Sequence, residues 1–456
     1  MIHCYRLGGY NIVIDVVSGS IHSVDDVAFD VISMYERENR EEIEKHIKRK
    51  FTEIDDAGLA DIFTDIDQLI NQGKLFSLDT FEHVKEHTRN KPLKALCLNV
   101  SHACNMSCFY CFAGNGKYGG AGELMSFETG KRAIDFLVES SAGRKNLDID
   151  FFGGEPLLNW NVIKDIVRYA RSIEQESIKK FRFTLTTNGL LIDDDVTSFT
   201  NKEMHNVVLS LDGRPETNDA TRKLPDGTGS YNNVVPKFRK IVQARGGKGY
   251  YIRGTFTRDN LDFVNDILHI ADIGFGELSM EPVVTKPGTP YGLTMDDLPM
   301  LDKQYELLAL EMIKRKKEGR GFTFYHYILN LPEGPCVHKR LAGCGVGSEY
   351  LAVTPGGELY PCHQFVGDRN FLMGDVWQGV VNKKLLDEFA VCDIYTRSEC
   401  RECWARMYCS GGCAANAYNA TDSIGGVYKL GCEMFKKRIE CAVMIKVSEC
   451  VSDDCE

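Results

Sequence analysis

The distribution of cysteine is the sequence feature that most constrains this chain. The sequence holds 17 cysteines in 456 residues, and none of them lies between Phe112 and Pro335. Cys4 stands alone, a group follows from Cys97 to Cys111, and the remaining cysteines lie between Cys336 and Cys455. The first residues show no apolar export signal, and in a reducing compartment so many thiols indicate metal or redox chemistry rather than disulfides. We therefore expect two metal-binding regions on either side of a cysteine-free middle.

Composition narrows the class of protein. Hydrophobic residues make up 43% of the chain and charged residues 26%, which is typical of a folded protein. The net charge of -11, without a block of basic residues, disfavours binding to nucleic acid or to an anionic membrane surface. No apolar run approaches the roughly 18 residues that a membrane span needs. We expect a cytoplasmic protein of about three domains, with no nucleic-acid or membrane partner.

Residues 1–85 form the first expected domain. Two strands are predicted there, at Tyr10–Val17 and Ile21–Val24, because β-branched residues flank the turn at Ser18-Gly19-Ser20. Apolar residues at three- and four-residue spacing predict three helices, at Asp25–Glu36, Arg40–Phe51 and Asp56–Gln72. The polar segment Asp79–Lys91 follows as a linker.

Residues 92–320 form the second expected domain, in which strands and helices alternate. Six strands are predicted, at Ala95–Val100, Leu147–Phe152, Phe181–Thr186, Asn206–Leu211, Tyr250–Thr257 and Glu277–Glu281. Helices are predicted between and after them, at Ser126–Ser140, Asn159–Ser172, Asp193–Asn201, Tyr231–Arg245, Leu261–Ile273 and Met295–Gly319. This order predicts an α/β fold with a parallel sheet, a partial (β/α)6 barrel of the TIM type. Its active site should lie at the carboxyl ends of the strands.

Residues 322–456 form the third expected domain. The segment is rich in glycine and cysteine, and we expect short strands without a large apolar core. Bound metal should then hold it together.

The first cysteine group has a spacing that suits an iron–sulfur cluster. Cys104, Cys108 and Cys111 follow a C-x3-C-x2-C pattern directly after the strand that ends at Val100. Three thiolates on one loop can hold three irons of a [4Fe–4S] cube and leave the fourth iron open to a small molecule. Buried thiols or a zinc knuckle are the alternatives.

This loop resembles that of the radical S-adenosylmethionine (SAM) enzymes. The resemblance implies that the open iron binds SAM and that one electron cleaves SAM to a 5′-deoxyadenosyl radical, with Cys104, Cys108 and Cys111 as the catalytic metal ligands. It also implies that Tyr110, directly before the last cysteine of the loop, packs near the adenine.

Segments at three later strand ends resemble the SAM-binding elements of the same family. They are Gly153-Gly154-Glu155-Pro156, Thr186-Thr187-Asn188-Gly189, and Ser210-Leu211-Asp212-Gly213 with Arg222 beyond it. The resemblance implies that Gly153, Gly154, Thr186 and Asn188 lie against SAM and that Glu155 accepts a hydrogen bond from its ammonium group. By the same resemblance, Ser210 and Asp212 lie near the ribose and Arg222 near the carboxylate. Each segment alone is also typical of an ordinary turn.

The second cysteine region resembles the SPASM extension of peptide-modifying radical SAM enzymes, which binds two auxiliary [4Fe–4S] clusters. The resemblance implies three clusters in all. It assigns one set of ligands, here called the outer set, to Cys400, Cys403, Cys409 and Cys432. It assigns a second set, the inner set, to Cys344, Cys362 and Cys413, with Cys336 left open as a fourth ligand. If Cys336 does not bind, an open inner iron is available for a substrate thiolate. Two zinc ribbons are the physical alternative. Outside the pattern, buried or surface thiols are expected at Cys392, Cys441, Cys450 and Cys455.

The whole layout resembles the maturases of SCIFF peptides, which carry six cysteines in forty-five residues. Residues 1–85 resemble a winged-helix-like domain that binds a leader peptide by strand addition, at an edge offered by Tyr10–Val17 or Ile21–Val24. A stabilising cap or a dimerisation unit is the other reading of residues 1–85. The resemblance implies thioether (sactionine) bonds from cysteine sulfur to the α-carbon of an acceptor Thr. It also implies two partners, a Cys-rich precursor peptide and an external electron donor of the flavodoxin or ferredoxin type.

Several other functions stay open. His363 stands where sulfatase-maturing relatives carry an Asp after the cysteine, which weakens formylglycine formation. Carbon–carbon cross-linking is another SPASM reaction. From a different class, the chain is a non-catalytic Fe–S electron carrier or a zinc-binding adaptor.

Overall fold

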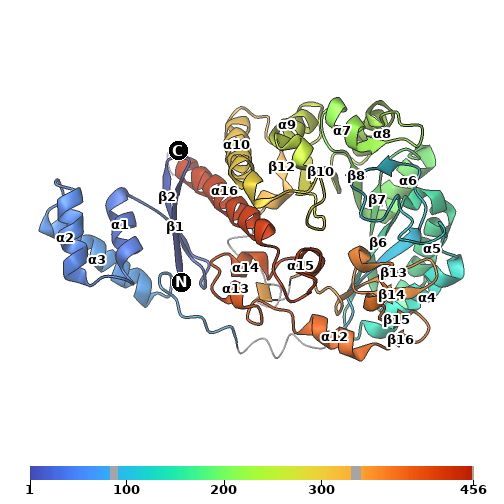
Figure 1. Cartoon of the computed structure of the whole chain (residues 1–456), viewed down its shortest axis with the longest axis horizontal. Coiled ribbons are helices and arrows are strands. Elements are labelled where there is room, and N and C mark those ends of the chain that lie inside the picture. Colours follow the sequence, from blue (N-terminus) through green and yellow to red (C-terminus); the bar gives the residue numbers. More distant parts are fainter. Residues whose placement is uncertain (83–90, 330–339, 342, 454–456) are drawn as a thin grey trace.

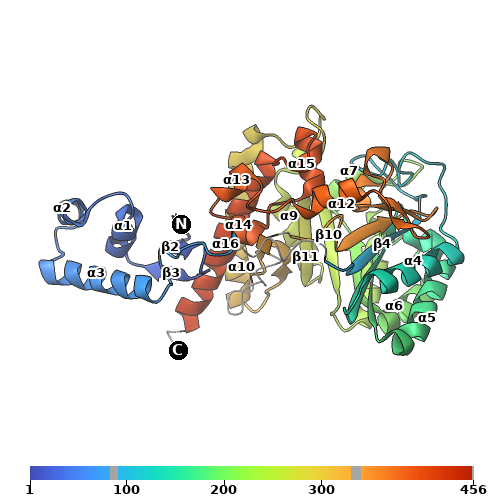
Figure 2. The same cartoon turned by 90° about the horizontal axis from the view of Figure 1, so that it is seen from below.

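The computed structural model describes residues 1–82, 91–329, 340–341 and 343–453. Its N-terminal helices lie at one end of an elongated molecule, and the large sheet with its covering helices lies at the other (Figures 1 and 2). The C-terminal helices lie between them. In the described part of the chain, no helix combines the length and the apolar character that crossing a bilayer requires.

The N-terminal unit contains a three-stranded antiparallel sheet in the order β1 (Ile2–Leu7), β2 (Tyr10–Asp15), β3 (Ile21–Val24). Three helices follow, α1 (Asp26–Met34), α2 (Arg40–Lys50) and α3 (Asp56–Asn71). The strand β1 was not predicted, and it pairs with β2 along their whole length. Because β2 is the central strand, the expectation that Tyr10–Val17 offers a free edge was wrong, and only β3 of the two candidates is an edge strand.

The six strands predicted for the second domain form one parallel run, in chain order, at the centre of the large sheet. They are β4 (Ala95–Ser101), β6 (Asn146–Gly153), β7 (Lys180–Thr187), β8 (Met204–Ser210), β10 (Tyr250–Phe256) and β11 (Glu277–Pro282). The connecting helices cover one face of this run and are α4 (Phe127–Ser140), α5 (Trp160–Ser177), α6 (Asp194–Glu203), α8 (Tyr231–Ala244) and α9 (Phe263–Asp272). The predicted α/β fold, a parallel run of six strands with connecting helices, is confirmed.

The sheet continues beyond the six strands at both sides. On one side β12 (Thr323–Phe324) pairs with β11, and on the other β13 (Tyr350–Val353) pairs parallel with β4. Three short antiparallel strands complete that side, β14 (Glu358–Tyr360), β15 (Gly374–Asp375) and β16 (Gly379–Val380). Part of the C-terminal third of the chain is therefore built into the same sheet as the central strands.

The rest of the C-terminal third is helical, so the expectation of short strands without an apolar core was wrong there. Its helices are α12 (Lys383–Ala390), α13 (Ser398–Arg401), α14 (Arg406–Cys409), α15 (Ala414–Thr421) and α16 (Lys429–Asp453). The long helix α16 packs along α10 (Leu298–Lys317) and also against β1. Because neighbours surround α16, its buried residues do not follow a single stripe, and periodicity gave no helix signal.

The N-terminal sheet docks on this helical part. The ring of His3 in β1 stacks on the indole of Trp404, with centroids 3.7 Å apart, and its Nε2 lies 3.0 Å from Glu440 of α16. Val16 shares a small apolar core with Cys400 and Met407. The first 17 residues therefore pack directly on the loop that carries the outer cysteine set.

Candidate functional site

The loop of Cys104, Cys108 and Cys111 lies at the carboxyl end of β4. A two-residue strand in the loop, β5 (Ser107–Cys108), pairs antiparallel with β9 (Arg222–Lys223), so Cys108 and Arg222 are direct cross-strand partners. The three thiols are free and close enough to interact electrostatically. Burial, together with the charge of Glu155, raises the pKa of Cys104 to about 12. This thiol is therefore protonated at neutral pH until a bound metal displaces its proton.

The end of β6 packs on this loop through glycine backbone. The amide of Gly154 donates to the carbonyl of Ser101 at 2.7 Å, and that of Glu155 donates to Ala103 at 2.8 Å. A Cβ atom added at Gly154 would lie 2.2 Å from the carbonyl oxygen of Ala103, closer than any side chain tolerates. Gly153 has a φ of 128°, which side-chain-bearing residues rarely adopt. Glycine at both positions is thus a steric requirement of this contact.

Glu155 joins the ends of β6 and β7 from a buried position. Its carboxylate accepts hydrogen bonds from the Thr187 hydroxyl at 2.7 Å and from the amide of Asn188 at 2.8 Å. Burial raises its pKa to about 6, against the effect of these hydrogen bonds. The Asn188 side chain donates to Asn105 at 2.8 Å and lies 3.8 Å from the sulfur of Cys104. The predicted residues Glu155 and Asn188 therefore come together beside Cys104, whereas Thr187 of the same segment was given no role because only the fold reveals its contact.

Tyr110, Asp212 and Arg222 form a connected group on the other side of the loop. The Tyr110 hydroxyl donates to Asp212 at 2.7 Å and accepts from Arg222 at 2.8 Å, and Arg222 lies 3.8 Å from Asp212. Thr221 also donates to Asp212, which is fully buried. Three residues expected to face SAM are thus held by one another at the ends of β4 and β8. Ser210 lies beside them, half-buried at the end of β8, and Thr186 is half-buried near the end of β7.

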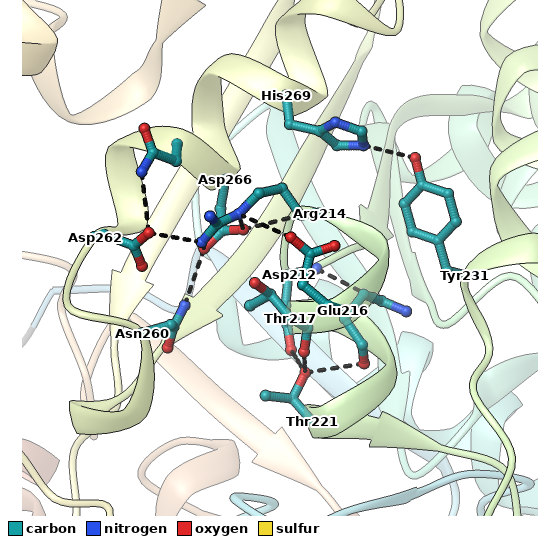
Figure 3. A network of polar contacts seen from close by, with 12 residues as sticks. Asp212, Arg214, Glu216, Thr217, Thr221, Tyr231, Asn260, Asp262, Asp266 and His269 are labelled. Carbon is teal, nitrogen blue, oxygen red and sulfur yellow. Dashed lines mark hydrogen bonds and ion pairs between the residues drawn. The ribbon is translucent and has the colours of Figure 1, made fainter.

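A second polar network lies at the turn that follows Asp212 (Figure 3). The guanidinium of Arg214 pairs with the buried Asp266 at 2.8 Å and with Asp262 at 2.9 Å. A Cβ atom at Gly213 would lie 2.3 Å from Asp266. Arg214 and Asp266 therefore fix the turn that carries Asp212. Sequence reasoning missed both, because no local pattern links residues 52 positions apart.

The structure gathers the C-terminal cysteines in two sets. Cys409 interacts electrostatically with the three other members of the outer set, Cys400, Cys403 and Cys432. In the inner set, Cys362 interacts with Cys344 and Cys413. Burial raises the pKa of Cys409 to about 12 and that of Cys432 to about 11. Cys336, the open question of the inner set, lies outside the described residues, as does Cys455.

The three cysteine sets offer free thiols, the ligands that iron–sulfur clusters use. Within the described residues, no three His, Cys, Asp or Glu side chains converge closely enough to hold one metal ion. A four-iron cube spreads its ligands over separate corners, whereas tetrahedral zinc draws four ligands to one point. The Nε of Arg222 is buried beside Cys108 without a hydrogen-bond partner in the described chain, which suits an anionic group at the first set.

His363 and the remaining cysteines lie around these sets. The ring of His363 lies against Phe152 at the end of β6, with centroids 4.8 Å apart, and against Phe112. Cys441 is buried on α16, while Cys392 is half-buried and Cys450 is exposed.

Comparison with known proteins agrees with this geometry. Residues 98–265 match the family model described as the radical SAM superfamily. The chain is 22% identical to the radical SAM cyclopropyl synthase TigE of Paramaledivibacter caminithermalis, over 92% of this chain and 89% of that protein. It is also 22% identical to a cysteine-type anaerobic sulfatase-maturating enzyme of Clostridium novyi, over 77% of this chain and 95% of that one.

A solved structure extends the comparison to the fold. The structure of anSMEcpe with bound AdoMet and the Cp18Cys peptide superposes with a TM-score of 0.64 at 21% identity, covering 79% of this chain and 99% of that one. The chain therefore has the fold of the radical SAM enzymes, and its residues 98–265 are similar to that superfamily.

Proposed function

We propose that this protein is a peptide maturase that joins a cysteine sulfur to the α-carbon of an acceptor residue, Thr by resemblance to the SCIFF class, in a Cys-rich precursor peptide. The observation that carries the proposal is the gathering of ten cysteines into three sets, one at the strand ends of a parallel sheet and two in the C-terminal part. A three-domain arrangement, with residues 1–85, 92–320 and 322–456 as leader, SAM and auxiliary-cluster parts, belongs to the same proposal.

The predicted site residues have different roles. Cys104, Cys108 and Cys111 would hold a [4Fe–4S] cluster, and the outer and inner sets would hold two more. When bound, the first cluster and SAM supply a 5′-deoxyadenosyl radical, which removes a hydrogen atom from carbon. Gly153 and Gly154 let the backbone approach the bound molecule.

The polar residues then orient SAM. Glu155 and Asn188 would bind its amino group on one side of the first cysteine loop. On the other side, the group of Tyr110, Asp212 and Arg222 with Ser210 provides acceptors for the ribose and a cation for the carboxylate. Since hydrogen bonds already fix Asp212 and Arg222, little ordering is needed when SAM binds.

The reaction removes hydrogen from the peptide, and the loss can be measured as a change in peptide mass. The new carbon–sulfur bond removes one hydrogen from the cysteine thiol and one from the α-carbon. The α-hydrogen would go to the deoxyadenosyl group that SAM supplies, and the thiol hydrogen would leave as a proton and an electron. This electron would leave through the C-terminal cysteine sets, and an external donor of the flavodoxin or ferredoxin type would supply the electron that the cleavage of SAM consumes.

The experiment is anaerobic co-expression with a candidate Cys-rich precursor peptide, followed by mass spectrometry. Each thioether should lower the peptide mass by two hydrogens and protect one cysteine from alkylation. The chain with Cys104, Cys108 and Cys111 replaced by alanine is the control and should leave the peptide unchanged. A peptide modified equally by this variant would contradict the proposal.

Cysteine oxidation to formylglycine is the second candidate, because a sulfatase-maturating enzyme is among the relatives. The same mass spectrum separates the two reactions. A thioether retains the sulfur of the cysteine, whereas formylglycine loses it.

The leader of the peptide would bind at β3 (Ile21–Val24). The amide of Asp15 donates to Ser20, so the register of β2 and β3 leaves the amides of Ile21 and Ser23 turned away from β2. No further strand of the described chain pairs with that edge. Ser23→Pro should therefore weaken peptide binding without breaking the β2–β3 ladder, while Ser23→Ala should bind normally. Equal affinity of the two variants would place the leader elsewhere.

A further inference from the structure

Buried cations surround the outer cysteine set of Cys400, Cys403, Cys409 and Cys432. Arg397 directly precedes α13 and interacts electrostatically with Cys400. Arg438 lies on α16, the helix that also carries Cys432, and interacts with Cys409. The two arginines are only 5% and 8% exposed.

Within the described residues Arg397 forms no ion pair, and the carboxylate that interacts with its charge, Glu399, is exposed. Its guanidinium donates to the backbone carbonyls of Gly411 and Ile424, both of which are neutral. Its Nε is buried without an acceptor among the described residues, and the guanidinium also interacts with the thiol of Cys392. A buried cation that meets only neutral acceptors is strongly destabilised unless a negative charge lies nearby.

Arg438 is balanced only loosely. Its nearest carboxylate oxygen is that of Glu281 on β11, 3.9 Å away, and its guanidinium lies 5.6 Å from the ring of Tyr305. Its Nε is likewise buried without an acceptor among the described residues. Both arginines therefore keep a buried Nε donor unused, and each interacts electrostatically with a cysteine of the outer set.

The outer set supplies the missing negative charge only when it holds metal. A protonated thiol is neutral, whereas a metal-bound cysteine is a thiolate. Four thiolates outweigh the positive charge of a [4Fe–4S] core, so the complete cluster is an anion. Nearby charges and hydrogen bonds to the sulfur atoms set the reduction potential of such a cluster.

We propose that Arg397 and Arg438 are the counter-charges of the outer cluster and raise its reduction potential, and that Glu281 moderates the effect of Arg438. This inference rests on the proposed function, because it needs a cluster at the outer set. It adds two residues outside the cysteine pattern that favour electron transfer onto that cluster. It also connects the cluster electrostatically to β11 of the central sheet.

The test is a redox titration followed by electron paramagnetic resonance on the full, anaerobically reconstituted chain. Replacing Cys104, Cys108 and Cys111 by alanine leaves the signals of the C-terminal clusters, and a further Cys409→Ala identifies the outer one by its loss. Arg397→Gln and Arg438→Gln should shift the outer potential down. Glu281→Gln should shift it up, because Arg438 then acts unopposed. Arg369→Gln, which removes an arginine that is 73% exposed and paired with Glu358, is the matched control and should leave it unchanged.

Opposite shifts from Arg438→Gln and Glu281→Gln would support the inference, since a purely structural disturbance has no reason to follow the sign of the charge. Unchanged potentials in Arg397→Gln and Arg438→Gln would overturn the inference. Shifts of equal sign in Arg438→Gln and Glu281→Gln would also overturn it. If Arg438→Gln loses the signal of the outer cluster, Arg438→Lys is measured in its place. Recovery of the signal in Arg438→Lys supports a role of charge, and loss of the signal in both variants contradicts it. A chain that binds no iron at all would instead contradict the proposed function.

Discussion

Asp79 accepts a hydrogen bond from Arg406 at 2.8 Å and another from the Tyr395 hydroxyl at 2.8 Å. Arg406 lies between Cys403 and Cys409 of the outer set, and its side chain is 7% exposed. A residue that follows the N-terminal unit therefore neutralises a buried cation in the cysteine loop. The N-terminal part of the chain and the outer site are consequently one structural assembly.

Asp79→Asn should destabilise the protein by about 2–3 kcal/mol, because it leaves Arg406 buried without its counter-charge. Urea unfolding of the reconstituted protein measures this loss. Glu82→Gln is the matched control, since it removes the partner of Arg401 in an ion pair whose side chains are 45% and 48% exposed. That change should cost at most about 1 kcal/mol. Similar losses in both variants would show that Arg406 does not depend on Asp79.

Gly154→Ala should abolish SAM cleavage while the protein stays folded. The new methyl group would meet the carbonyl of Ala103 at 2.2 Å and push the first cysteine loop away from β6. A displacement of about 1 Å at a reacting centre can cost about 10²-fold in rate. Production of 5′-deoxyadenosine is the readout, and Gly143→Ala is the control because no atom lies within 4 Å of its added methyl group. Full activity of Gly154→Ala would contradict the described contact.

Acidification should destabilise the protein partly through His326. Burial, opposed by Glu281, lowers its pKa from 6.5 to about 4. Below pH 6.5 the unfolded chain therefore binds a proton that the folded chain does not, so stability falls as the pH falls. The loss should be about 1 kcal/mol between about pH 7 and 5.5. His326→Gln should reduce the pH dependence of the urea midpoint by that amount, although His102 and His363, whose pKa values burial also lowers to about 4, keep part of it. An identical pH profile in the variant would exclude His326 as a contributor.

The central strands could be predicted because the alternation of buried and less buried residues is visible within each strand's own sequence. In β7 (Lys180–Thr187), buried Phe181, Phe183 and Leu185 alternate with half-buried residues, and the predicted strand differs from the observed one by a single residue at each end. The strand β1 was missed although Gly8 and Gly9 gave a signal for it. Both have positive φ and form the two-residue turn of a hairpin, a pattern that Gly-Gly between two strands predicts.

In the site, too, some features could be predicted from the sequence and others depend on the fold. The cysteine sets and Glu155 could be found because their spacing is local or resembles a known pattern. The bond between Tyr110 and Asp212 could not, because 102 residues separate them and only the strand order brings them together. The helix α16 was not predicted. It packs against neighbours on several sides, so its apolar residues do not lie along one face. The counter-charges Arg397 and Arg438 likewise become visible only when burial is known.

The most direct test of the central claim measures iron and SAM cleavage in the same anaerobically reconstituted samples. The intact chain should bind about twelve irons, as expected for three cubes, and should form 5′-deoxyadenosine when it is reduced. Replacing Cys104, Cys108 and Cys111 by alanine should remove about four irons and all 5′-deoxyadenosine while the other clusters remain. Unchanged 5′-deoxyadenosine formation in that variant, or zinc in place of iron in the intact chain, would contradict the account.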